Sequence, residues 1–270
     1  MSGGEPAELD VLIRIAYSVH RAFNRVRRSP SRGTIVGMGA FGSPTEEIDR
    51  AAEAQVLASL ESEGVDWDVL SEEAGHVRRG GARTLVVDPV DGSHNALRGL
   101  PFATVSLALG SKDLAGVDVA VVHDLFRGQT YWAVKGQGVY RDGHRIRPRT
   151  WDPRTELFLL NLGRHATPRS IQWAGKGRRT RSLGCASYEL ALVAEGSADA
   201  YFFENDPPTS NLRVTDIAAG YRILVEAGGG ATDALGASLE ETPLRLDQRR
   251  SVFAWGDPRF AASAGPEGYL

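Results

Sequence analysis

A short apolar strand that ends in carboxylates constrains this chain more than any other feature. The run Thr84-Leu85-Val86-Val87 is typical of a buried strand, and Asp88-Pro89-Val90-Asp91-Gly92 follows it directly. Pro89 fixes one backbone angle there, and Gly92 permits the tight turn that follows. Two carboxylates and a backbone carbonyl could then converge on one point, which is the arrangement that a hard cation requires. The same residues would also suit an ordinary Asp-Gly turn.

Two further segments place carboxylates beside apolar runs. The run Val69-Leu70-Ser71 leads directly into Glu72 and Glu73. Far downstream, Asp216 opens an alanine-rich apolar segment that runs to the glycines at 228–230, a pattern that predicts a helix with a glycine stop. An aspartate in this position could serve only as a helix N-cap. The three segments together favour a metal site over three unrelated turns and caps.

These motifs resemble those of a known family. The octapeptide from Asp88 to Asn95 and the segment from Thr215 to Gly220, with Glu72-Glu73 upstream, are similar to the paired motifs of the magnesium-dependent, lithium-sensitive phosphatases that include inositol monophosphatase and fructose-1,6-bisphosphatase. The segment from Gly42 to Asp49 resembles the archaeal-type branch with dual activity. The resemblance implies an α/β fold, a layered α-β-α-β-α sandwich with its metal cleft between an N-terminal α+β lobe (1–150) and a C-terminal α/β lobe (151–270).

The resemblance also implies roles for individual residues. Glu72, Asp88 and the Val90 carbonyl would hold a first Mg²⁺ ion; Asp88 would bridge to a second ion, completed by Asp91 and Asp216. Two or three ions are expected, and Mn²⁺ would substitute for Mg²⁺; Phe41 stands where the branch has the loop aspartate of the third ion's site. Glu72 and the pair Asp49 and Ser93 would act in catalysis by placing the attacking water, although Ser93 could equally cap its own turn. The predicted substrate-binding residues are Gly92, Ser93, Cys185, Ala186, Glu204 and Arg213.

The implied reaction is the hydrolysis of inositol-1-phosphate, fructose-1,6-bisphosphate or both, by in-line attack of water. Two divalent ions about 3.5–4 Å apart can activate the water and neutralise charge on the phosphoryl group. A 3′(2′),5′-bisphosphate nucleotidase is the alternative within the class, but its relatives carry Lys/Arg-Glu where His94-Asn95 stands here. A non-catalytic relative that binds a metal and a sugar phosphate is a second alternative. Degenerate members of that kind lose a metal carboxylate, and none is missing here.

Composition narrows the classes of partner that this chain is expected to bind. The 270 residues are 42% hydrophobic, enough for one large domain or two lobes, and a net charge of −3 gives no basic face for nucleic acid. No apolar run approaches the ~18 residues of a membrane span. A single cysteine, Cys185, fits a reducing cytoplasm. We therefore expect a cytoplasmic protein whose partner is a small phosphorylated sugar or cyclitol, and the resemblance implies a homodimer.

The periodicity of apolar residues predicts the order of helices and strands. Helices are expected at 7–27, 44–63, 186–194 and from Asp216 onward, with a glycine-rich loop at 29–44. Alternating runs predict an antiparallel sheet from strands at 103–109, 117–122 and 130–134, followed by a hairpin at 136–143. Strands at 157–162, 198–203 and 251–255 are expected in the second half.

Overall fold

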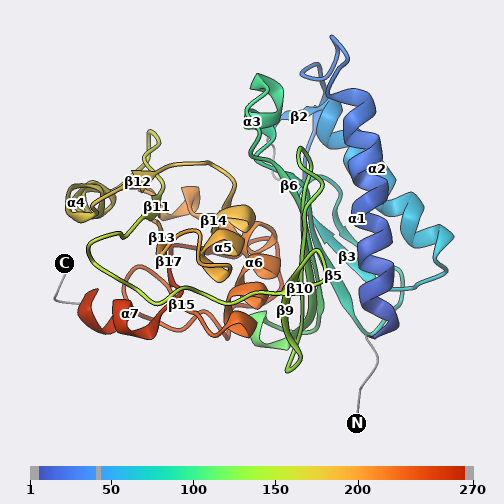
Figure 1. Ribbon diagram of the computed structural model, residues 1–270. Coiled ribbons are helices and arrows are strands. Elements are labelled where there is room, and N and C mark those ends of the chain that lie inside the picture. Colours follow the sequence, from blue (N-terminus) through green and yellow to red (C-terminus); the bar gives the residue numbers. More distant parts are fainter. Residues whose placement is uncertain (1–5, 41–43, 265–270) are drawn as a thin grey trace.

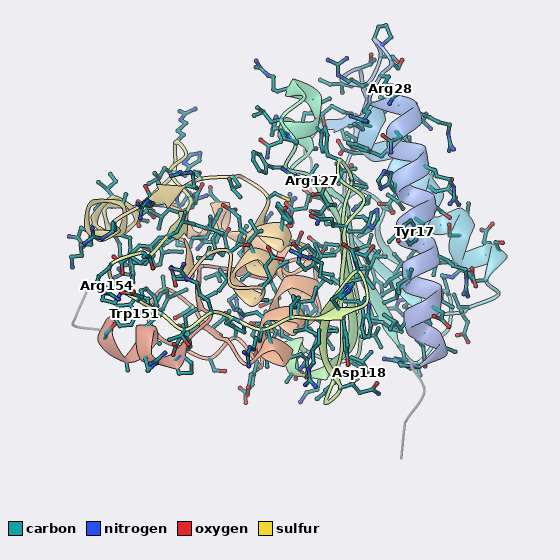
Figure 2. The ribbon with its side chains drawn as sticks, in the orientation of Figure 1. Tyr17, Arg28, Asp118, Arg127, Trp151 and Arg154 are labelled. Atoms are coloured by element: carbon teal, nitrogen blue, oxygen red, sulfur yellow. The ribbon has the colours of Figure 1, made fainter. Side chains whose placement is uncertain are left out.

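Five layers of helices and sheets make up the molecule. A computed structural model describes residues 6–40 and 44–264. Two N-terminal helices cover one face of a large sheet, a second pair of helices covers its other face, and a smaller sheet and two short helices complete the stack (Figure 1). Side chains fill the spaces between the layers (Figure 2). The predicted α-β-α-β-α order is confirmed.

The first layer consists of α1 (Ala7–Val26) and α2 (Glu47–Ser62). Their apolar stripes face the large sheet, because residues three and four apart lie on one side of a helix. The predicted start of the second helix at residue 44 is wrong: β2 (Pro44–Glu46) pairs there with β1 (Ile35–Met38). The predicted loop at 29–44 therefore contains a strand, whose side chains are all exposed and so carry no buried periodicity.

The large sheet has eight strands in the order β10-β9-β8-β7-β6-β5-β3-β4. Neighbouring strands are antiparallel, as predicted for its central part, except that β3 and β5 run parallel. The strand bounds are β3 (Asp68–Ser71), β4 (Gly75–Val77), β5 (Thr84–Asp91), β6 (Thr104–Gly110), β7 (Val117–Asp124), β8 (Thr130–Val134), β9 (Gly138–Arg141) and β10 (His144–Arg145).

The second half of the chain forms the other three layers. The middle layer holds α5 (Ala186–Ala194), which matches its prediction, and α6 (Val214–Ala227). The smaller sheet has the order β12-β11-β13-β17-β15, with bounds β12 (Thr180–Arg181), β11 (Phe158–Leu160), β13 (Ala200–Phe203), β17 (Val252–Trp255) and β15 (Gly230–Thr232). The outer helices, α4 (Pro168–Lys176) and α7 (Pro258–Ala264), were not predicted from the sequence. A separate pair joins β14 (Leu212–Arg213) to β16 (Arg249–Arg250).

Alternation along the strands distributes the apolar side chains among three cores. On β5, Leu85 and Val87 pack against the first helical layer, whereas Val86 faces α5 and α6. On β13, Tyr201 faces the middle layer and Phe202 faces the outer one, because successive side chains of a strand point to opposite faces. The core thus continues across residue 150, and the two-lobe division at that residue stays a prediction.

Within 6–40 and 44–264, no helix combines the length and apolar character that crossing a lipid bilayer would require.

A pair of histidines, of which His123 is fully buried and His20 half-buried, joins α1 to the large sheet and makes folding stability depend on pH. His20 Nδ1 lies 2.6 Å from His123 Nε2, and His123 Nδ1 lies 2.8 Å from Thr130 Oγ1. Burial lowers the pKa of His123 to about 4. An unfolded chain takes up this proton near pH 6.5, so stability falls as pH drops from about 6.5 toward 4. We expect His123 to account for a loss of about 2 kcal/mol between pH 7.5 and 5.

Urea unfolding at the two pH values measures this effect, and the variant His123→Gln should lose less stability on acidification than the wild type. Buried carboxyls with raised pKa values act in the opposite direction, so only the difference between proteins is informative. His144→Gln, at an exposed position, is the matched control and should behave like the wild type. Equal acid sensitivity of His123→Gln and the wild type would contradict the assignment.

Candidate metal centre and active site

An irregularity in β5 places its two aspartates on one face of the large sheet. Asp88 lies opposite Ser106 of β6, and Asp91 lies opposite Thr104, so β5 contains one residue more than its partner over this stretch. In a regular strand, residues three apart point to opposite faces. The extra residue of this bulge turns both carboxylates toward α5 and α6. The Asp88 carboxylate also accepts a hydrogen bond from the Val90 amide at 3.0 Å.

Three carboxylates from distant parts of the chain meet at this face. Glu72 follows β3, Asp88 lies in β5 and Asp216 lies in the first turn of α6; ligand oxygens of the three lie within 4.8 Å of one another. The Arg213 amide donates to the Asp216 carboxylate at 2.8 Å, and the Arg213 guanidinium pairs with Glu72. The structure thus brings together Glu72, Asp88, Asp216 and Arg213, which the sequence singled out.

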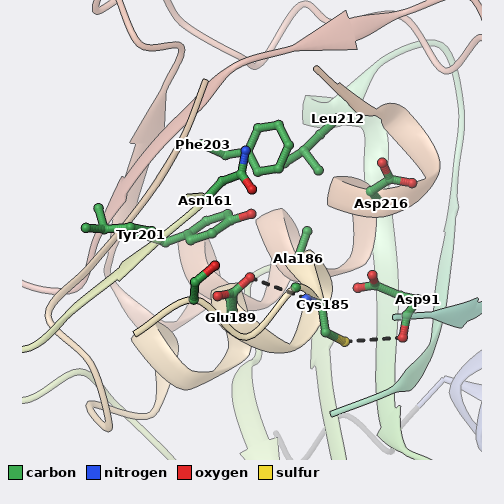
Figure 3. Close-up of a pocket in the computed structure, with 12 residues that line it drawn as sticks. Asp91, Asn161, Cys185, Ala186, Glu189, Tyr201, Phe203, Leu212 and Asp216 are labelled. Carbon is green, nitrogen blue, oxygen red and sulfur yellow. Dashed lines mark hydrogen bonds between the residues drawn. The ribbon is translucent and has the colours of Figure 1, made fainter. Parts of the chain in front are cut away.

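Asp91 is held in place by the start of α5. One of its carboxylate oxygens accepts hydrogen bonds from the Ser187 amide at 2.7 Å and from the Ser187 hydroxyl at 2.6 Å. The Cys185 thiol donates to the Asp91 carbonyl at 3.3 Å (Figure 3). Sequence reasoning missed Ser187; its only signal in the sequence is a hydroxyl residue at the start of an apolar helix. Such second contacts fix the direction in which a carboxylate presents its remaining oxygen.

Burial and mutual repulsion disturb the protonation of these carboxyls. Burial raises the pKa of Asp88 well above its usual range, and the charges of Asp91, Asp216 and Asp49 raise it further. Burial also raises the pKa of Asp91 to about 6, although the bonds from Ser187 oppose this shift. Crowded carboxylates of this kind are stabilised by a divalent cation, because its charge offsets both desolvation and repulsion. The oxygen donor set therefore fits Mg²⁺ or a similar hard cation.

The acidic cluster joins two cavities. One, of about 280 Å³, is lined by the predicted residues Asp49, Glu72, Asp88, Val90 and Ser93. The other, of about 160 Å³, is lined by Asp91, Asp216, Cys185 and Ala186, with Asp91 and Asp216 on one side and Tyr201 on the other (Figure 3). Gly92 stands in the chain between Asp91, which lines the smaller cavity, and Ser93, which lines the larger one.

Ser93 and Asp49 line the same cavity. Ser93 begins the short helix α3 (Ser93–Arg98), which follows Gly92 directly. The Asp49 carboxyl is buried next to Glu46 and Glu73; burial first, and then a hydrogen bond with Glu46, raise its pKa to about 8. The predicted pairing of Asp49 with Ser93 and the catalytic roles of both stay predictions. Phe41, on which the question of a third ion depends, lies outside the described residues.

Glu204 does not line the smaller cavity, of about 160 Å³. Its carboxylate accepts hydrogen bonds from Thr167 at 2.7 Å and from Arg169 at 2.9 Å. Phe203, the preceding residue, lines the cavity instead, as do Asn161, Glu189 and Tyr201, none of which the sequence had suggested. The cause is again strand alternation: near the end of β13, adjacent residues point to opposite faces, and the sequence did not show which of them faced the site.

The fold and the site together define an α/β protein with a partly buried carboxylate cluster suited to divalent cations. The model of the inositol monophosphatase family matches residues 8–265, and the chain belongs to this family. It is 36% identical to the fructose-1,6-bisphosphatase/inositol-1-monophosphatase of Methanothermobacter thermautotrophicus, over 92% of this chain and 91% of that protein. It is 34% identical to the protein of the same name from Thermococcus kodakarensis, with 84% of each chain covered.

Solved structures agree with this assignment. A Pyrococcus horikoshii protein described as having similarities to inositol-1 monophosphatase superposes with a TM-score of 0.75 at 27% identity, covering 94% of this chain and 97% of that one. The predicted family and fold class are thereby confirmed.

Proposed function

We propose that this protein is a magnesium-dependent phosphomonoesterase that hydrolyses inositol-1-phosphate, fructose-1,6-bisphosphate or both. The observation that carries the proposal is the meeting of Glu72, Asp88 and Asp216 between two cavities, one on each side of the cluster. The names of the Methanothermobacter and Thermococcus relatives support the two substrates. Mn²⁺ can replace Mg²⁺, and the carboxylates named suffice to hold two ions.

Each residue has a distinct part in this proposal. Glu72, Asp88, Asp91, Asp216 and the Val90 carbonyl would hold the ions, which when bound supply an activated water and positive charge beside the phosphoryl group. Ser187 orients Asp91, and the Arg213 amide orients Asp216. Gly92, Ser93, Cys185 and Ala186 would contact the substrate, and Arg213 would contribute positive charge beside Glu72.

The remaining roles follow the same proposal. Ser93 and Asp49 would position the attacking water, and Glu72 would assist them; these three residues line the same cavity. The partner is a small phosphorylated sugar or cyclitol, and we propose a cytoplasmic homodimer. In this proposal Glu204 does not contact the substrate directly, because its carboxylate is held by Thr167 and Arg169.

A panel of phosphate esters tests the activity. We expect release of inorganic phosphate from inositol-1-phosphate or fructose-1,6-bisphosphate with Mg²⁺, and loss of that release when EDTA removes the ion. Adenosine 3′,5′-bisphosphate serves as the competing substrate and should react more slowly than either. Release from the nucleotide alone would contradict the proposed substrates, and release from none of the three would indicate a binding protein.

A further inference from the structure

Asn95 ends the octapeptide that begins at Asp88, and the proposed chemistry gives it no role. It lies in α3, and its Nδ2 donates hydrogen bonds to three main-chain carbonyls: Leu183 at 2.7 Å, Phe102 at 2.9 Å and Gly184 at 3.2 Å. An amide nitrogen carries two hydrogens, so these three acceptors use its whole donor capacity. One side chain therefore joins α3, the segment before β6 and a loop that lies 88 residues further along the chain.

The loop at residues 183–185 is held by side chains. It connects β12 to α5, and Gly184 and Cys185 line the smaller cavity. The buried Glu189 carboxylate accepts hydrogen bonds from the Leu183 amide at 2.9 Å and from the Cys185 amide at 3.4 Å. Main-chain groups outside helices and strands require partners of this kind. Glu189 thus holds the loop through its N–H groups, and Asn95 holds it through its carbonyl groups.

The same loop packs directly on the turn that carries the acidic motif. A Cβ built on Gly92 would lie 3.3 Å from the Gly184 carbonyl oxygen, and the Cys185 thiol donates to the Asp91 carbonyl at 3.3 Å. Gly184 has a φ of +70°, and a glycine can leave such a conformation more easily than any other residue. A loop released from Asn95 would therefore shift against Asp91 and change the smaller cavity.

Resting on the proposed function, we propose that Asn95 is a positioning residue, which fixes the distance between the acidic cluster and the loop at residues 183–185. Asn95 contacts neither the phosphoryl group nor the leaving alcohol. Because α3 follows Gly92 directly, its amide transmits the position of the acidic turn to the loop. A phosphate ester that is bound by the cluster at one end and by the loop at the other reacts fast only when both ends are in place together.

Steady-state kinetics with two variants test this proposal. Asn95→Ala removes the donor, and Asn95→Asp keeps the size of the side chain but cannot donate once ionised. Both should fold, because Asn95 is only partly buried and water can replace its amide. For inositol-1-phosphate or fructose-1,6-bisphosphate, whichever the wild type hydrolyses, kcat/KM should fall about tenfold to a hundredfold. The inhibition constant of inorganic phosphate, which has no alcohol part, should change less than about twofold.

Asn24→Ala is the matched control. Asn24 lies on α1 and accepts a hydrogen bond from the Arg27 guanidinium at 2.6 Å, so the substitution removes an equal side chain away from the loop. We expect this variant to retain the wild-type values of kcat/KM and of the inhibition constant. A general loss of structure in the Asn95 variants would instead weaken the ester and inorganic phosphate alike.

Hydrogen–deuterium exchange measures the loop without any substrate. The amides of Leu183 and Cys185 should exchange at least about tenfold faster in Asn95→Ala than in the wild type, and at the wild-type rate in Asn24→Ala. Unchanged exchange at the loop, or equal losses for the ester and inorganic phosphate, would overturn the positioning role. If no ester releases phosphate while exchange at the loop depends on Asn95, the proposed function fails and the hold of Asn95 on the loop stands. If neither is seen, both are wrong.

Discussion

Replacing Asp88 with asparagine should lower kcat/KM at least about a thousandfold, because a metal carboxylate supplies several kcal/mol of charge stabilisation in such reactions. The same change should make the metal-free protein more stable. Asp88 is buried, and Asp91, Asp216 and Asp49 repel its charge. Asparagine removes that repulsion and keeps an oxygen for the bond from the Val90 amide. Activity and stability should therefore change in opposite directions.

Thermal unfolding in EDTA and in Mg²⁺ measures the second part. With EDTA, Asp88→Asn should unfold at a higher temperature than the wild type. With Mg²⁺, the wild type should gain stability from ion binding, and the variant should gain less. Asp247→Asn is the control, since Asp247 is an exposed residue that bonds to Arg245, and it should match the wild type in both respects. An active Asp88→Asn enzyme, or one destabilised in EDTA, would contradict the role of Asp88.

Gly92→Ala should disrupt both the fold around the motif and the activity. Gly92 has a φ of +85°, and a Cβ there would lie 2.5 Å from the Phe102 carbonyl oxygen. The residue stands between Asp91 and the start of α3, so relieving this collision must move one of them. Misplacement of a catalytic group by about 1 Å can lower a rate by about a hundredfold, and we expect a loss of at least this size.

Gly99 offers a matched control at the other end of the same helix. Its φ is +75°, close to that of Gly92, but nothing lies within 4 Å of a Cβ built there. Gly99→Ala should therefore cost only the conformational penalty of about 1–2 kcal/mol and leave kcat near that of the wild type. Urea unfolding and kcat, measured for both variants, separate the cost of the left-handed backbone conformation from the cost of the collision with Phe102. Equal effects of the two substitutions would mean that the contact with Phe102 is unimportant.

Much of the fold could be read from local patterns. The stripe of α1 was predicted closely, because a helix that buries one face must repeat its apolar residues every three or four positions. The bounds of α5 were also predicted, from a short run of largely apolar residues that is buried on almost every side. The exposed strand β1 and the short helix α4 escaped prediction. All four residues of β1 are exposed, and α4 buries only Ser170 and Trp173, so neither element has a long apolar period.

The residues of the candidate site also divide into those that sequence motifs predicted and those that only the structure revealed. The acidic motifs gave Glu72, Asp88 and Asp216 without any structure, and Asp49 and Ser93 fell in the same cavity as two of them. Ser187 and Phe203 could not be found in this manner. Neither belongs to a sequence motif. Ser187 matters because it bonds to Asp91 of the large sheet, and Phe203 because it lines the cavity beside Asp91 and Asp216.

The amino-acid sequence alone determined which chemistry is available here: a family, a layered α/β architecture and a set of carboxylates suited to a hard cation. Only the tertiary structure decided how those groups face one another. One extra residue in β5 turned Asp88 and Asp91 to the same side, and the alternation of β13 put Phe203 rather than Glu204 in the cavity. The physical reason is that composition and spacing record what a segment can bury, whereas the side to which each residue points depends on pairing between strands that lie far apart in the chain.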